Sequence, residues 1–345
     1  MTDTTQPLST GRKILFTIIS ILFALGVIFF IGELVARLFY QPPAHYQKAD
    51  VDSKFGWYTK SNDQQVGKQK DKAGNEYDVI YETEKNGFRE WGDVNSKKKK
   101  VFFLGDSYIQ SVEVSNDKLF YNLLKDSLDI EVFAFGQAGF GNWQQYLVLE
   151  KFFDVIKPDV VVLQTCDNDF IDNYHQLELE SGYKVGLERP YLKLDGSTEF
   201  YKPVPKTQRM IAKSKFLSYL AFKFNVLQQK TNTAAVLAEK KIAEQKRGYN
   251  HFDHAVKITD KILEKFRTRI PEEVQFIGFS ASIFNPQLSE FQQIFKKHNI
   301  PFYAEPALAI QQAQQQKQIV NSADGYHWSE AGHEVIGREI YKVLK

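Results

Sequence analysis

Five short apolar runs, separated by segments with helical periodicity, constrain the fold of this chain more than any other feature. Each run is apolar at consecutive positions, as is typical of strands that helices cover on both faces of a parallel sheet. This alternation predicts an α/β fold, a three-layer α/β/α sandwich around a five-stranded parallel sheet. The predicted strands are residues 101–104, 131–135, 159–164, 274–279 and 301–304. The predicted helices are residues 117–128, 142–156, 251–269, 286–298 and 329–344.

The parts of the chain outside this alternation predict a lead-in and an insertion. From Tyr40 to about Val94 the chain is polar and includes Pro42-Pro43, so we expect residues 37–99 to form a tether and lead-in segment that packs on a domain of residues 100–345. From about 170 to 250 a turn-rich stretch is followed by a helical stretch rich in Lys, Gln and Ala. We expect an insertion there, on the face where the strands end. Such insertions often shape substrate access, and a plain solvated helical excursion fits the pattern equally well.

The N-terminus predicts a membrane-spanning helix. Residues 14–32 are 19 uncharged, almost wholly apolar positions, which nearly match a hydrocarbon core of ~30 Å at 1.5 Å per residue. Arg12 and Lys13 precede them, and positive charge before a first span stays in the cytoplasm. We therefore expect a cytoplasmic tail at 1–13, a signal anchor at 14–36 and the remainder in the periplasm or outside the cell. The alternative is a cleaved signal peptide, whose apolar region is usually ~7–15 residues long.

Composition narrows the classes of partner. The formal net charge of +2 gives no support to a nucleic-acid partner. Cys166 is the single cysteine, which excludes an internal disulfide framework. The Cys and His spacing does not predict a zinc site, so we expect neither a metal nor another cofactor.

The first predicted strand ends at Gly105-Asp106-Ser107, which would deliver a serine to the carboxyl edge of the sheet. Ligands of open α/β sheets bind at that edge, so the position suits a nucleophile. By itself the tripeptide is more typical of an ordinary turn. A serine hydroxyl becomes a nucleophile only when a base, itself oriented by a third group, removes its proton.

Asp324 and His327 are the best candidates for that base and its orienting group. They lie three residues apart, before a predicted helix with Ser329 as its N-cap. In a tight loop this spacing lets the carboxylate reach the imidazole and hold its tautomer. His333 is the weaker candidate base because it falls inside the helical pattern.

Two further strand ends offer donors for an oxyanion. The stretch Phe135-Gly136-Gln137-Ala138-Gly139-Phe140-Gly141-Asn142 follows the second strand, and its glycines let backbone N–H groups approach a ligand closely. Its spacing is neither a dinucleotide fingerprint nor a P-loop, so a nucleotide site is not favoured. Asn168, after the third strand, can present its amide N–H to an oxyanion, or else the segment is a turn initiated by Asx residues.

Together these blocks resemble the SGNH or GDSL hydrolase family, whose four marker residues are a Ser, a Gly, an Asn and a His in that order. Ser107, Gly139, Asn168 and His327 match them, and the resemblance covers about residues 100–345. Asn86-Gly87-Phe88-Arg89 also resembles a segment of the membrane-anchored bacterial members. The resemblance implies a flavodoxin-like α/β/α fold.

The family roles carry over to the matching positions. Ser107 would be the nucleophile, His327 the general base and acid, and Asp324 the orienting carboxylate. The N–H groups of Ser107 and Gly139 and the amide of Asn168 would form the oxyanion hole. The chain departs from the family pattern at two other positions. Cys166 stands where the family usually has Gly, and Trp328 stands where Pro often follows the histidine. The first would narrow or move the oxyanion loop, and the second would place an aromatic wall beside the base.

The resemblance implies an ester hydrolase that removes acyl groups, with acetyl favoured, from a carbohydrate or lipid ester outside the cytoplasm. An O-acyltransferase that modifies cell-surface polysaccharide would use the same residues, and some anchored relatives that resemble it work beside a membrane acyl-donor protein. A binding module that has lost activity is the third reading, less favoured because all four blocks are intact.

Overall fold

The computed structural model describes residues 9–40, 49–181, 188–201, 211, 213–231 and 238–345. Two compact units make up the chain, Met1–Ala44 with Val204–Thr233 and His45–Pro203 with Ala234–Lys345. The lead-in from residue 49 onward therefore groups with the sheet, whereas residues 204–233 of the expected insertion group with the N-terminal helix. Parts of the predicted tail, lead-in and insertion lie outside the described residues, at 1–8, 41–48, 182–187, 202–210, 212 and 232–237.

The larger unit is built on a six-stranded sheet with the order β12-β11-β8-β6-β7-β5. Its five parallel strands are β6 (Lys100–Gly105), β7 (Glu131–Gly136), β8 (Val160–Thr165), β11 (Gln275–Ser280) and β12 (Phe302–Tyr303). They confirm the predicted parallel sheet. The sixth strand, β5 (Glu90–Trp91), runs antiparallel to β7. It was not predicted, because two residues are too few to show a periodicity.

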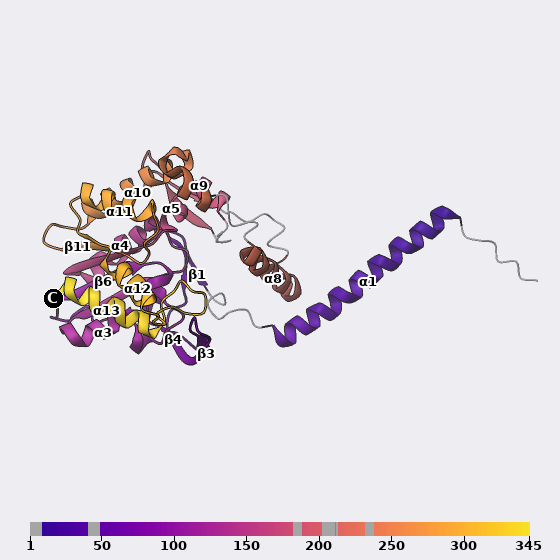
Figure 1. Cartoon of the computed structure of the whole chain (residues 1–345), viewed down its shortest axis with the longest axis horizontal. Helices are drawn as coiled ribbons and strands as arrows, with labels where there is room; N and C mark the ends of the chain where they lie inside the picture. The colour runs from indigo at the N-terminus through magenta and orange to yellow at the C-terminus, as the bar shows by residue number, and fades with distance from the viewer. Residues whose placement is uncertain (1–8, 41–48, 182–187, 202–210, 212, 232–237) are drawn as a thin grey trace, which may run out of the picture. The chain divides into compact units, whose positions relative to one another are not determined.

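Helices cover both faces of this sheet, which confirms the α/β/α sandwich (Figure 1). One face carries α4 (Asn142–Ile156), α10 (Asn250–Arg269) and α11 (Gln287–Lys297), and the other carries α3 (Phe120–Leu128), α12 (Glu305–Gln315) and α13 (Glu330–Leu344). Along β6, Phe102 and Leu104 enter the first core and Val101 and Phe103 the second, all fully buried. Burying such a side chain stabilises the fold by roughly 1.5–3 kcal/mol. A strand buried on both faces is therefore apolar at every position.

The lead-in holds one of the predicted site loops. It contains the strand pair β1 (Ala49–Asp52) and β2 (Gly56–Thr59) and the hairpin β3 (Asp63–Lys70) and β4 (Glu76–Thr83). The tip of the hairpin pairs with the loop before α13: Lys72 N–H donates to Asn321 O over 3.0 Å, and Ala323 N–H donates to Lys70 O over 2.8 Å. The hairpin thus braces the loop that carries Asp324.

Short elements complete the larger unit: α2 (Ser107–Gln110), α5 (Asp169–Asp172), α6 (His175–Glu180), β9 (Arg189–Leu192), β10 (Thr198–Tyr201) and α9 (Ala238–Gln245). The 3-10 turns are Lys85–Gly87, Asn116–Lys118 and Lys246–Gly248.

The smaller unit contains α1 (Thr10–Phe39) and α8 (Lys215–Thr231). The predicted anchor lies within α1, whose most apolar window has a mean hydropathy of 3.0 and is not buried. By length and composition α1 can cross a membrane, and a signal sequence would fit the same description.

Candidate active site

The order of the central strands brings the predicted site residues to one edge of the sheet. β6 lies between β7 on one side and β8 on the other, so the chain reverses its winding direction at β6. Ligands of open α/β sheets bind outside the carboxyl ends of the strands at such a switch point. Ser107, Gly139 and Asn168 follow β6, β7 and β8 respectively.

Ser107 is held at the first position of α2 by a tightly packed turn. A Cβ atom on Gly105 would lie 2.2 Å from Gln164 Oε1 and 2.4 Å from Ile109 Cγ1, so a larger residue there would force its neighbours to move. Asp106 is completely buried and caps α2, accepting a 2.9 Å hydrogen bond from Tyr108 N–H. Ser107 lies between the buried end of β6 and the capped start of α2, and it is itself only partly buried.

His327 joins Ser107 to Asp324. Its Nε2 lies 2.8 Å from Ser107 Oγ, and its Nδ1 is hydrogen-bonded to Asp324 Oδ2. Asp324 is held in turn by Ser322 Oγ at 2.9 Å and by the N–H groups of Tyr326 and His327 at 2.8 and 3.0 Å. The carboxylate therefore fixes both the backbone of the loop and the imidazole ring. Hydroxyl, imidazole and carboxylate stand in series, as proton transfer from a serine requires.

A second carboxylate, which sequence reasoning missed, faces the same ring. Glu113, in the turn after α2, places Oε1 3.6 Å from His327 Nδ1. Its other oxygen is buried without a hydrogen-bond partner among the described residues, and burial raises the pKa of Glu113. The signal available in the sequence was an acidic residue between two valines, six positions after Ser107.

These acids set the charge preference of the imidazole. Burial disfavours the imidazolium, but the hydrogen bond to Asp324 and the negative charges of Glu113 and Asp324 outweigh it and raise the pKa of His327 to about 9. For Asp324, burial acts to raise the pKa, but its hydrogen bonds and the imidazolium charge bring it well below its usual range. The site therefore stabilises the protonated form of the His327 imidazole.

The aromatic neighbour of the base is Tyr108 rather than Trp328. The ring of Tyr108 lies 5.1 Å from the His327 ring and 4.7 Å from Trp328, between centroids. Trp328 is 2 % exposed and packs against His333 in the core. An aromatic ring therefore lies beside His327 as expected. It is the ring of Tyr108, and Trp328 packs against that ring.

His333 belongs to the core. It is fully buried, its Nδ1 accepts from Phe120 N–H over 3.3 Å, and burial lowers its pKa to about 3. It therefore stays neutral and serves as a packing residue between α13 and α3.

The loop after β7 is positioned by α2 and the lead-in. Gly139 has a φ of 75°, in the region that favours glycine. The Gln110 side chain accepts from Ala138 N–H over 2.8 Å, and Trp57 Nε1 donates to Ala138 O over 3.4 Å. Within the described part of the chain, neither Ser107 N–H nor Gly139 N–H donates to a protein group. Both donors are therefore available to a ligand.

Cys166 fixes the orientation of Asn168. Its sulfur lies 2.7 Å from Asp106 Oδ2 and contacts Asn168 Oδ1. Burial raises the pKa of Cys166, so the thiol keeps its proton. Because the Asn168 oxygen faces this thiol, its amide nitrogen points the other way, where it donates to Asp172 Oδ2 over 2.8 Å. A side-chain amide has two N–H bonds, which leaves one for a substrate oxygen.

A buried arginine of the insertion positions Asn168 through Asp172. Arg189, at the start of β9, is 1 % exposed and forms a 2.8 Å ion pair with Asp172. It also donates to the Asp172 backbone carbonyl over 2.9 Å. The buried Arg189 guanidinium thus positions the Asp172 carboxylate, which in turn accepts the hydrogen bond of the Asn168 amide. Sequence reasoning placed the insertion near the site but did not identify this link.

The upstream Asn86-Gly87-Phe88-Arg89 segment braces the turn that carries Glu113. Arg89 is fully buried and donates to Val114 O at 3.1 Å and to Ser111 O at 3.4 Å. Two backbone carbonyls on either side of Glu113 are therefore tied to one guanidinium.

Among the described residues, two groups of side chains have the types and spacing of metal ligands, with ligand atoms within 4.8 Å of one another. They are Glu113, Asp324 and His327, and Asp106, Cys166 and Asp169. Hydrogen bonds join the members of each group, except that Glu113 faces His327 across 3.6 Å as an ion pair. We therefore assign no metal to either group.

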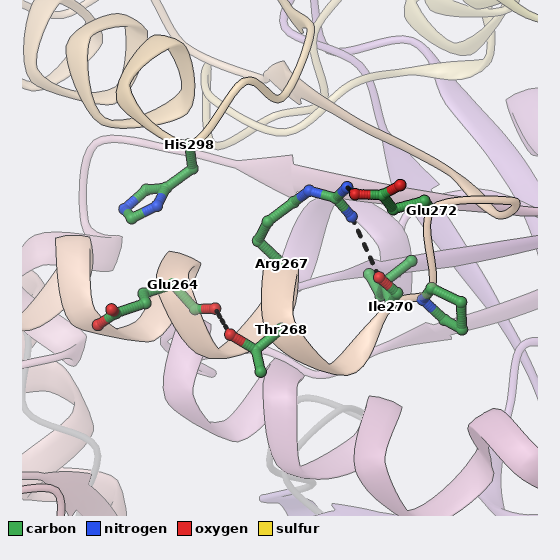
Figure 2. A pocket seen from close by; sticks show the side chains of 7 residues that line it. Glu264, Arg267, Thr268, Ile270, Glu272 and His298 are labelled. Atoms are coloured by element: carbon green, nitrogen blue, oxygen red, sulfur yellow. Dashed lines mark hydrogen bonds and ion pairs between the residues drawn. The ribbon is translucent and has the colours of Figure 1, made fainter.

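A separate pocket lies at the end of α10, between Arg267, Glu272 and His298 (Figure 2). The one hydroxyl in its lining, Thr268 Oγ1, donates to the Glu264 backbone carbonyl one helical turn earlier. This hydroxyl is therefore engaged, and the lining of the pocket contains no serine that could pair with His298. The site at the ends of β6, β7 and β8 is the candidate for chemistry.

An α/β/α sandwich with serine, imidazole and carboxylate in series at its switch point defines a serine hydrolase. Residues 101–340 match the GDSL-like lipase/acylhydrolase family, and the chain belongs to this family. It is a serine esterase of the SGNH/GDSL type. Among curated proteins, none matches the sequence.

Several solved structures match part of this chain. A psychrotrophic esterase from Pseudoalteromonas sp. is 11% identical, with 71% of this chain and 96% of that chain covered and a TM-score of 0.37. The lipase/acylhydrolase from Enterococcus faecalis is 16% identical, with coverages of 71% and 95% and a TM-score of 0.38. A catalytic mutant of an acetylxylan esterase from Geobacillus stearothermophilus is 13% identical, with coverages of 72% and 94% and a TM-score of 0.39.

Proposed function

We propose that this esterase removes acyl groups, acetyl foremost, from a carbohydrate or lipid ester outside the cytoplasm, through an acyl intermediate on Ser107. The observation that carries the proposal is the hydrogen-bonded series from Ser107 through His327 to Asp324. A compact acyl group suits a nucleophile that Tyr108 borders closely, since its ring packs against the base.

In the proposed reaction, Ser107 Oγ attacks the ester carbonyl as its proton passes to His327 Nε2. The new imidazolium lies against Asp324 and Glu113, whose charges stabilise it. The N–H groups of Ser107 and Gly139 and the free amide N–H of Asn168 bind the oxyanion. His327 then protonates the leaving alcohol, and a water, activated by the same imidazole, releases the acid from Ser107.

We further propose that α1 is an uncleaved anchor with its N-terminus in the cytoplasm. The apolar stretch 14–32 is long enough to span the hydrocarbon core, and Arg12 and Lys13 lie at its N-terminal end. The larger unit would then act in the periplasm or outside the cell, on envelope esters.

The test of the reaction type uses the full chain in detergent with p-nitrophenyl acetate and an oligosaccharide acceptor, followed by mass spectrometry. Hydrolysis releases acetate and p-nitrophenol and leaves the sugar unmodified, and Ser107→Ala should remove nearly all of this release. Accumulation of acetylated sugar in preference to free acid would instead identify an O-acyltransferase, one that takes its acyl group from a membrane donor protein in the cell.

Replacing Asn168 with alanine is expected to lower kcat by about 10²- to 10³-fold with little change in KM, because the oxyanion donor acts mainly in the transition state. Steady-state kinetics on p-nitrophenyl acetate measure the split. Asn122→Ala is the matched control, since Asn122 lies in α3 and its amide donates to Asn116 O. Equal kcat values for Asn168→Ala and the wild type would remove Asn168 from the oxyanion hole.

The pH profile is expected to shift when Glu113 becomes glutamine. The base works only when neutral, so kcat/KM of the wild type should rise with pH to a half-maximum near pH 9, the raised pKa of His327. Glu113→Gln removes one negative charge that favours the imidazolium, so the half-maximum should move to lower pH. The high-pH plateau should also fall, because the transition-state imidazolium loses the same charge.

The control for Glu113 is Glu272→Gln, which removes the same charge at a side chain that is 96% exposed. It should leave the profile in place. An unchanged profile for Glu113→Gln, or a shift to higher pH, would show that Glu113 does not act on the imidazole.

A further inference from the structure

In the smaller unit, one carboxylate of the N-terminal helix binds the start of a helix from the insertion. Glu33 of α1 accepts from Ser214 Oγ at 2.7 Å and from the N–H groups of Phe216 and Lys215 at 3.0 and 3.3 Å. The two N–H donors belong to the first turn of α8, where backbone N–H groups have no acceptor within the helix, and Ser214 is the residue before it. Arg37 Nε donates to the same carboxylate over 2.8 Å. Glu33 therefore ties the start of α8 to one level of α1.

That level is the end of the apolar stretch 14–32. Phe216 packs edge-on against Phe29, with 6.2 Å between ring centroids. A Cβ atom on Gly32 would lie only 2.7 Å from the Phe216 ring, so α8 approaches the backbone of α1 closely at that point. Phe29 lies about one helical turn inside the apolar stretch. The first turn of α8 therefore begins where that stretch ends.

Two apolar side chains beyond the first turn of α8 are exposed. Leu220 is 45% exposed and Phe224 is 58% exposed. Lys215 is exposed and nine residues before Phe224, so at 3.6 residues per turn these two lie on opposite sides of the helix. One side of α8 is therefore apolar and open, while the other carries a positive charge.

We propose that α8 is a second membrane-binding element, which lies in the outer interface of the bilayer beside α1 with Leu220 and Phe224 among the lipid acyl chains. This proposal rests on the proposed anchoring of α1, because a spanning α1 places Glu33 and the start of α8 at the hydrocarbon boundary. An apolar helix face continuous with a spanning helix meets lipid there, and a basic opposite face meets headgroups and water. The hydrogen bonds of α8 satisfy the Glu33 charge at that depth.

The proposal predicts which positions of α8 contact lipid. Single cysteines at Leu220, Phe224, Lys215 and Leu22 are introduced into the full chain, labelled with an environment-sensitive nitrobenzoxadiazole dye and reconstituted at one copy per nanodisc of phosphatidylethanolamine and phosphatidylglycerol. The native Cys166 is 1% exposed, and the wild type supplies the labelling background. Lipids with a doxyl quencher high or low on the acyl chain then report the depth of each dye.

We expect dyes at Leu220→Cys and Phe224→Cys to emit at shorter wavelength and to lose intensity with the shallow quencher. The dye at Lys215→Cys should do neither. The dye at Leu22→Cys, in the middle of α1, should lose intensity with the deep quencher. Together these results would place α8 in the interface.

Three results would overturn the proposal. If Leu22→Cys is quenched while Leu220→Cys and Phe224→Cys behave like Lys215→Cys, then α1 spans the bilayer and α8 does not touch it. A blue shift at 220 and 224 without lipid quenching would show that protein covers this face. If Leu22→Cys is also unquenched, the anchor fails along with α8. Esterase turnover in the same nanodiscs separates each result from a failure of the proposed reaction.

Discussion

Replacing Ser107 with alanine is expected to lower kcat toward p-nitrophenyl acetate by about 10⁴- to 10⁶-fold, to the level left by binding and oxyanion donors alone. The reason is that the hydroxyl 2.8 Å from His327 Nε2 supplies the atom that bonds to the acyl group. The measurement is steady-state release of p-nitrophenol by the full chain in detergent. Mass spectrometry after rapid quenching should detect the acyl adduct on the wild type and not on the variant.

The control for this loss is Ser127→Ala, at an exposed hydroxyl of α3 that donates to Leu123 O. It should keep wild-type turnover and an acyl adduct. Equal turnover by Ser107→Ala and wild type would contradict the proposed nucleophile. Thermal unfolding of each variant shows that a loss of activity is not a loss of fold.

Replacing His327 with alanine is expected to lower kcat by a similar factor, because among the described residues His327 is the base that is hydrogen-bonded to the Ser107 hydroxyl. Its matched partner is His333→Gln, which keeps an acceptor for Phe120 N–H. That variant should lower the melting temperature and retain most of the turnover of its folded fraction, since His333 is a core residue. Both variants are measured for kcat and for thermal unfolding in the same detergent.

The two histidines make this comparison decisive for the assignment of the base. A mild loss in His327→Ala together with inactivity of folded His333→Gln would reverse it. The double variant Ser107→Ala with His327→Ala should be no worse than either single variant, because residues that act as one unit are not additive.

The strands and helices that were predictable from the sequence are those whose apolar residues follow the period of the element throughout its length. The α4 helix has the predicted bounds of Asn142–Ile156, and β6, β7, β8 and β11 lie within one residue of prediction. Their apolar runs are continuous because both faces are covered. The α12 helix was missed because its glutamine-rich sequence lacks that signal, although Pro306 lies at its start.

The lead-in and insertion were less predictable, because their roles depend on contacts with distant residues. Nothing in the local pattern of the β3–β4 hairpin indicates that its tip braces the loop of Asp324. Likewise, the sequence shows Arg189 only as a basic residue in a turn-rich stretch. Its burial against Asp172 is visible only in the structure. Charged side chains that pair across a long sequence separation leave no periodicity to detect.

The sequence alone determined the layers of the fold, the apolar N-terminal helix and the order of Ser107, Gly139, Asn168 and His327, because burial and strand-end position leave local patterns. Only the tertiary structure decided that Glu113 shares the imidazole with Asp324, that the Cys166 thiol orients the Asn168 amide, and that Glu33 joins α8 to α1. Each of these contacts depends on the distance in space between two side chains. Hydrogen bonds and charges act over that distance, whatever the separation along the sequence.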